Sequence, residues 1–333
     1  MNELTRKKQR MRLFGFSLGL ATFVAFGVYA ARMLRGQDLS RYLAASALGG
    51  IVLCSLFYIL VIPIGALAWR CLLKDFGVEQ SWQSLTQIMS VTQMAKYLPG
   101  NFGHHLGRVG MALTREMTLP PVIVSIAIET LLAILAAVFI GVGSTWLSHA
   151  RGSALSHEHV ITVVLIAVLA VVFVAILTLG RNVLAQFIQR FLPAKMRSSS
   201  ALRTPRLKSM IFVFAAYCLV FTVVGGGITV MAALLLPNIP HNGLLLTGSF
   251  ATAWAIGFLV VGAPAGLGAR EGVMLAMLQS GYSGNNAIVL IIAIRLATTL
   301  GDVLCFVAGA VLSVYSRSST SETLNDQPKT SDP

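Results

Sequence analysis

The sequence predicts an all-α, polytopic integral membrane bundle, with about seven or eight spans and two broken or re-entrant helix motifs. Of its 333 residues, 56% are hydrophobic and 11% are charged, whereas soluble domains average about 45–50% apolar and about 25% charged residues. Several apolar runs approach the roughly 20 residues that a helix needs to cross a bilayer. They are too long and alternate too little in polarity for barrel strands, and a soluble fold could not bury them.

The first span is expected at 13–31, where an apolar stretch follows the basic segment 6–12. This charge order is also typical of a signal peptide, but the stretch is long and more spans follow, which favours an uncleaved helix. Length and hydropathy predict six further spans, at 43–69, 122–147, 160–180, 210–235, 244–262 and 286–315.

Two stretches, 82–121 and 263–283, fit neither a loop nor a complete span. Each contains Pro and Gly between apolar segments, so we expect each helix to break and form a re-entrant motif. Similar interrupted segments in the two halves of a chain point to the central site of a transporter, and they suggest an inverted repeat.

The domain organisation is expected to be simple. Residues 1–315 form one transmembrane domain, and the polar, Ser- and Thr-rich tail 316–333 is expected to be disordered. The longest polar connection is about 30 residues, shorter than the roughly 50 residues of the smallest usual domain. No soluble catalytic module therefore fits between the spans.

Basic residues flank the spans as the positive-inside rule expects. The net charge is +13, and the segment 181–208 carries basic residues and no acidic ones. We expect this segment and the N-terminus to be cytoplasmic. This placement argues against nucleic acid as a partner and suits anionic lipid headgroups.

Neither a metal nor a cofactor is expected. The four cysteines are scattered without metal-type spacing and are interpreted as small apolar residues. His149, His157 and His159 gather in one loop, but their spacing is not helical and Glu158 is the one carboxylate beside them. No nucleotide-binding loop motif is present, so direct use of ATP is not expected.

The first candidate site lies in the segment from Lys96 to Arg108. Pro99 and Gly100 should break the helix and expose free backbone amides. Lys96 and Arg108 flank the break, so a phosphate or phosphodiester is the natural ligand. The alternative is an interfacial loop with snorkelling basic residues.

Two histidines and a second glycine-rich segment extend this candidate site. His104 and His105 lie within the first motif, where imidazoles could bond headgroup oxygens. The second motif repeats the order of Pro, glycines and a basic residue, followed by an acidic one, and its candidate binding residues are Gly266, Gly268, Arg270 and Glu271. The alternative there is a tight turn in which the arginine pairs with the adjacent glutamate.

Glu129, Arg295 and Asp302 lie inside predicted spans. A charge at mid-bilayer costs at least about 2.5 kcal/mol, so each should face the bundle interior with a partner. Arg295 and Asp302 are two helical turns apart and share a face. We expect Arg295 to meet one of the glutamates, Glu129 or Glu271. We expect Asp302 to meet Lys96, Arg108 or Arg270.

Together the two motifs resemble the transmembrane, flippase-like domain of lysylphosphatidylglycerol synthases. The resemblance rests on Lys96-Tyr97-Leu98-Pro99-Gly100, Gly107-Arg108 and the segment 264–272, and it extends from the first span to about Tyr315. It implies a free-standing member without the soluble synthase domain, in the bacterial inner membrane. In that family the domain is thought to move an aminoacylated phospholipid between leaflets. The segment 101–105, Asn-Phe-Gly-His-His, departs from the bulky apolar stretch of many relatives and puts the ligand preference in doubt.

The leading hypothesis is translocation of a phospholipid or a lipid-linked glycan across the inner membrane. One alternative is a membrane-embedded glycosyl or lipid transferase that uses Glu271 or Glu129 as a general base. In that alternative the histidines would act as donors, and no activated nucleophile is apparent. The other alternative is a non-transporting scaffold that recruits envelope-biosynthesis enzymes through the basic segment 181–208.

Overall fold

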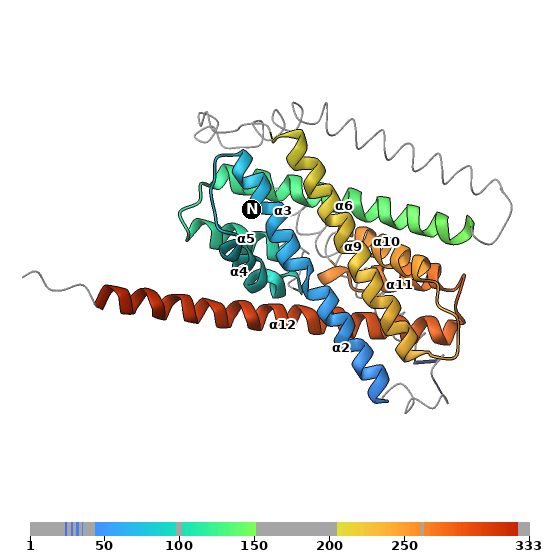
Figure 1. The fold of residues 1–333 in the computed structure, drawn as a ribbon. Helices are drawn as coiled ribbons and strands as arrows, with labels where there is room; N and C mark the ends of the chain where they lie inside the picture. Colours follow the sequence, from blue (N-terminus) through green and yellow to red (C-terminus); the bar gives the residue numbers. More distant parts are fainter. Residues whose placement is uncertain are drawn as a thin grey trace, which may run out of the picture.

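The computed structural model describes residues 44–97, 102–150, 205–260 and 263–325, with a few isolated residues between 24 and 35. In this part of the chain every regular element is a helix, which confirms the all-α prediction (Figure 1). The elements are α2 (Ala45–Ile59), α3 (Val61–Asp75), α4 (Trp82–Thr92), η2 (Gln93–Tyr97), α5 (Gly103–Leu113), α6 (Leu119–Ala150), α9 (Leu207–Leu235), α10 (Gly243–Leu259), η4 (Pro264–Gly266), α11 (Ala269–Leu278) and α12 (Gly284–Asn325).

Within the described residues, four helical segments are long and apolar enough to cross a membrane. They are Ala45–Asp75, which joins α2 and α3, Leu119–Ser148, Leu207–Leu235 and Gly284–Ser313; Gly243–Leu259 is a shorter apolar helix. These helices match five of the predicted spans, and the predicted spans 13–31 and 160–180 lie outside the described residues. The protein is therefore a multi-pass membrane protein.

The outer faces of the long helices are apolar. Large side chains such as Val52 on α2, Leu219 on α9 and Val307 on α12 are exposed. Exposure of such surfaces to water is unfavourable, whereas contact with the hydrocarbon chains of lipids is not. These faces are therefore suited to contact with lipid, and the polar groups lie inside the bundle.

Helix α9 packs against α2, α3, α6 and α10. The closest approach of α6 and α10 depends on small residues. A Cβ atom on Gly248 would lie 2.6 Å from the hydroxyl of Thr145 and 3.0 Å from the carbonyl oxygen of Gly141. Small residues let helices approach closely in membranes, where packing replaces the hydrophobic effect between helices.

The first predicted helix break is confirmed. The side chain of Ser81 caps the start of α4, and the chain turns back after η2 so that α5 packs against α4. Gly107 allows this approach, because a Cβ atom there would lie 2.9 Å from a methyl group of Thr92. The predicted stretch 82–121 thus forms a helical hairpin rather than one span.

The second predicted break, between α10 and α11, is also confirmed. Helix α10 ends at Leu259, and the short helix η4 and a turn lead into α11. Gly266 and Gly268 have φ angles of +69° and +81°, which glycine adopts without a Cβ clash. Ala265 has a φ of +49°, a strained value for a residue with a Cβ.

The two breaks meet inside the bundle. Helix η2 contacts η4, and α12 passes beside α4, η2 and α11 (Figure 1). Re-entry of these segments into the bilayer and an inverted repeat stay predictions. The division of the chain at 315 also stays a prediction, and α12 continues to Asn325.

Candidate functional site

A cavity of about 110 Å³ lies where the two helix breaks meet. Residues from most of the helices around the breaks line it, so its shape depends on the whole bundle. The lining residues are Tyr58, Val61, Ile62, Met89, Gln93, Lys96, His104, His105, Arg108, Glu129, Thr130, Ala133, Tyr217, Trp254, Phe258 and Arg270.

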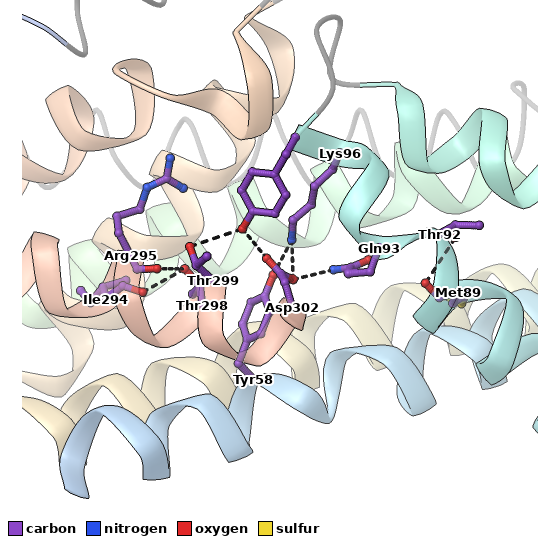
Figure 2. A network of polar contacts seen from close by, with 11 residues as sticks. Tyr58, Met89, Thr92, Gln93, Lys96, Ile294, Arg295, Thr298, Thr299 and Asp302 are labelled. Carbon is purple, nitrogen blue, oxygen red and sulfur yellow. Dashed lines mark hydrogen bonds and ion pairs between the residues drawn. The ribbon is translucent and has the colours of Figure 1, made fainter. Parts of the chain in front are cut away.

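The first ion pair joins the η2 segment to α12 (Figure 2). One oxygen of the buried Asp302 carboxylate accepts hydrogen bonds from Lys96 Nζ at 2.6 Å and Gln93 Nε2 at 3.0 Å. The other oxygen accepts from the Tyr97 hydroxyl at 2.7 Å, and Lys96 also donates to the Tyr58 hydroxyl at 3.0 Å. The predicted contact between Asp302 and Lys96 is confirmed, and one carboxylate holds the tip of the first hairpin against α12.

The second ion pair joins α5 to α6. Arg108 Nη2 donates to Glu129 Oε2 at 2.5 Å, and the hydroxyl of Tyr217 donates to Glu129 Oε1 at 2.5 Å. The guanidinium of Arg108 also lies over the ring of Trp69, 4.1 Å from its centroid, a favourable cation–π arrangement. Arg108 and Glu129 are both buried. Each compensates the charge of the other, which would be costly to bury alone.

The third ion pair joins α11 to α12. Glu271 pairs with Arg295, and its Oε2 atom accepts the backbone N–H of Gly268 at 2.6 Å. That bond satisfies a free donor at the start of α11, where a negative charge is also favoured by the helix dipole. The expected contact of Arg295 with a glutamate is confirmed, and the alternative pairing of Arg270 with Glu271 is wrong because Arg295 takes that carboxylate.

Arg270 differs from the other basic residues of the site. Among the described residues no carboxylate lies within 4 Å of it, and its buried Nε atom has no hydrogen-bond partner. Its side chain lies against Gly257 and Gly266, where a Cβ atom would come within 2.9 Å and 2.8 Å of Nε, respectively. The two glycines therefore hold the guanidinium in a narrow slot beside the cavity.

Two adjacent histidines provide further polar groups at the cavity. The rings of His104 and His105 are 3.8 Å apart, and the Nδ1 atom of each is buried without a partner in the described structure. His105 Nε2 lies 3.5 Å from the hydroxyl of Thr130. These nitrogen atoms can offer a hydrogen-bond donor or acceptor, depending on the tautomer.

Most of the predicted site residues come together in three dimensions. Lys96, His104, His105, Arg108, Glu129 and Arg270 line the cavity, Gly266 supports the arginine, and Gly268, Glu271, Arg295 and Asp302 belong to the ion pairs around it. Pro99 and Gly100 lie outside the described residues, so their part in binding stays a prediction.

The tyrosines and aromatic rings of the site were not predicted from the sequence. Tyr58 and Tyr217 bond to the charged residues, and their hydroxyl groups within long apolar runs were an available signal. Trp254 and Phe258 lie one turn apart on α10 and stack with an interplanar angle of 17°. Aromatic residues in an apolar helix give no sequence signal that separates a cavity wall from a lipid-facing surface.

A family model for the lysylphosphatidylglycerol synthase TM region matches residues 16–305. The chain belongs to this family. The match spans both helix breaks and all the charged residues of the cavity, and the resemblance proposed from the two motifs is thereby confirmed. A comparison with curated proteins finds no match.

Membership of the lysylphosphatidylglycerol synthase TM region family identifies the chain as a membrane protein of lipid or envelope metabolism that interacts with membrane phospholipids. The charged residues in and around the cavity are not equivalent. They comprise three compensated ion pairs and one basic residue, Arg270, that has no carboxylate partner in the described structure.

Proposed function

We propose that the protein translocates an anionic phospholipid or a lipid-linked glycan across the bacterial inner membrane, with the headgroup phosphate bound at Arg270. The observation that carries the proposal is the charge balance of the cavity. Lys96, Arg108 and Arg295 each pair with a carboxylate, whereas Arg270 faces the cavity without one in the described structure. A guanidinium without a direct ion-pair partner within a membrane bundle is costly, and a phosphate oxygen is the partner that its geometry suits.

Further donors around the cavity support phosphate binding. Arg108 Nε is buried without a partner in the described structure, although another nitrogen of the same group bonds Glu129. His104 and His105 add imidazole nitrogens for the other polar groups of a headgroup. A phosphodiester bound at Arg270 would thus meet several donors, as a desolvated anion requires.

The ion pairs connect the helical segments that would have to move during transport. The pair of Lys96 with Asp302 fastens the first hairpin to α12, and the pair of Glu271 with Arg295 fastens the start of α11 to the same helix. A phosphate that enters the cavity would also meet Lys96 and would compete with Asp302 for it. Ligand binding would therefore shift the hairpins relative to α12 and favour the opening of the cavity toward the other leaflet.

The test of the proposed function is leaflet exchange in proteoliposomes. Purified wild-type protein is expected to accelerate the exchange of a labelled phosphatidylglycerol or a labelled polyprenyl-phosphate hexose above the rate in protein-free vesicles, measured by chemical quenching of the outer leaflet. Mass spectrometry of the recovered lipid is expected to show unchanged molecules. A new lipid product would instead support the transferase, and exchange rates equal to those of empty vesicles for both lipids would contradict translocation.

Gly257→Ala is expected to slow exchange at least about 10-fold even though Arg270 is retained. The new methyl group would collide with the Arg270 side chain, and displacing the guanidinium loses a charge-assisted hydrogen bond of about 1.5–3 kcal/mol. Gly226→Ala on α9 is the matched control, because a Cβ atom there meets nothing within 4 Å. Equal exchange rates in the two folded variants would show that the position of Arg270 is unimportant.

A further inference from the structure

The acidic groups of the site leave no free carboxylate for a positively charged headgroup. Glu129 is the one acidic residue among the described residues that line the cavity. Its two oxygens already bond Arg108 and Tyr217. Asp302 accepts three hydrogen bonds, from Lys96, Gln93 and Tyr97, so it is also satisfied.

The neighbouring basic residue makes an ammonium group less favourable still. Arg270 lines the same cavity, and no described carboxylate lies within 4 Å of it. A second cation would meet like-charge repulsion in a medium that screens it poorly. An ammonium group within hydrogen-bond reach of Arg270 would therefore weaken binding.

One wall of the cavity is aromatic. The rings of Trp254 and Phe258 on α10 stack with centroids 5.6 Å apart. The ring of Phe221 meets Trp254 edge-on at 5.3 Å, and the ring of His105 meets Phe258 edge-on at 6.1 Å. These contacts fix the wall in place, and both side chains line the cavity, so the wall gives the cavity an apolar side that matches the C–H face of a sugar or another polyol.

The histidines suit the hydroxyl groups of such a ligand. The Nδ1 atoms of His104 and His105 are buried and lack partners in the described structure. A neutral imidazole has one donor and one acceptor nitrogen, whereas phosphate oxygens accept only. A hydroxyl group can donate and accept, so it can satisfy either nitrogen.

We infer that the transported headgroup is a phosphate ester of a sugar or another polyol that carries no ammonium group. This inference rests on the proposed function and names its substrate class. The phosphate binds at Arg270, the hydroxyl groups bond the two histidines, and the carbon face of the polyol lies on Trp254 and Phe258. Aminoacylated and ethanolamine headgroups are disfavoured because their ammonium group would face Arg270.

The test compares four lipids that carry the same acyl or prenyl label in proteoliposomes of wild-type protein. Phosphatidylglycerol and a polyprenyl-phosphate hexose contain the inferred group, whereas phosphatidylethanolamine and lysylphosphatidylglycerol add an ammonium group. We expect exchange of at least one of the first two lipids to be 10-fold faster or more than exchange of the last two. The faster lipid identifies whether the polyol is glycerol or a sugar.

Variants of the aromatic wall test its part in recognition. Trp254→Leu and Phe258→Leu are expected to slow exchange of the preferred lipid about 10-fold, whereas Trp254→Phe keeps a ring and retains most of the rate. Phe212→Leu is the control, because Phe212 is exposed on the outer face of α9. Unchanged rates in both leucine variants would overturn the role of the wall.

The outcomes separate this inference from the proposed function. Exchange of lysylphosphatidylglycerol or phosphatidylethanolamine as fast as the ammonium-free lipids would overturn the inference and leave translocation in place. Failure of all four lipids to exchange would overturn both.

Discussion

Replacing Arg270 with glutamine is expected to reduce headgroup transport by about 10- to 100-fold. The variant removes the one basic side chain of the cavity that has no carboxylate partner among the described residues. A hydrogen bond to a charged group contributes about 1.5–3 kcal/mol, which corresponds to that loss of affinity. Leaflet exchange at limiting lipid concentration measures the effect.

The controls for Arg270→Gln separate a local effect from a general loss of charge. Lys208→Gln makes the same change of charge at an exposed position near the start of α9 and should leave exchange unchanged. Arg270→Lys keeps the charge but loses the planar fork that fits a phosphate, so its rate should be intermediate. Wild-type exchange in Arg270→Gln would exclude this residue as the phosphate site.

Replacing Asp302 with asparagine is expected to lower the free energy of unfolding by about 3–5 kcal/mol. The side chain keeps its shape but loses the charge that compensates Lys96, and it accepts fewer of the bonds from Gln93 and Tyr97. A buried ammonium group without a counter-ion remains on η2. Equilibrium unfolding in detergent micelles measures the change.

A double variant shows whether the ion pair causes this loss. Combining Asp302→Asn with Lys96→Gln removes both charges and should recover part of the lost stability, because the partners are coupled. Glu79→Gln is the control for the carboxyl-to-amide change at an exposed position. Additive losses in the double variant would mean that the two residues contribute independently.

The sequence was most informative where one physical rule decides the structure. Length and hydropathy predicted the long helices because a bilayer demands them. Proline and glycine predicted the two breaks, and Gly266 and Gly268 do adopt positive φ angles. The spacing of Arg295 and Asp302 predicted a shared helix face, and both residues face the breaks, where they form ion pairs.

The sequence was least informative where tertiary packing selects between equal options. Several basic residues could have paired with each acidic one, and only the folding of α5 against α6 selects Arg108 for Glu129. These pairings also explain why Arg270 has no carboxylate partner in the described site, because the nearby carboxylates already pair with other basic residues. The aromatic wall could not be predicted for a similar reason, since Trp254 and Phe258 could equally have faced lipid.

The most direct test of the account is to locate a bound headgroup. The ammonium-free lipid that exchanges faster is given a photoreactive group in its headgroup and crosslinked to the wild-type protein in vesicles, and the adducts are mapped by peptide mass spectrometry. We expect adducts on cavity residues of α5 and α10, competed by the same lipid without the photoreactive group and lost in Arg270→Gln. Adducts confined to the lipid-facing side chains of α2, α9 and α12, and unchanged in Arg270→Gln, would contradict it.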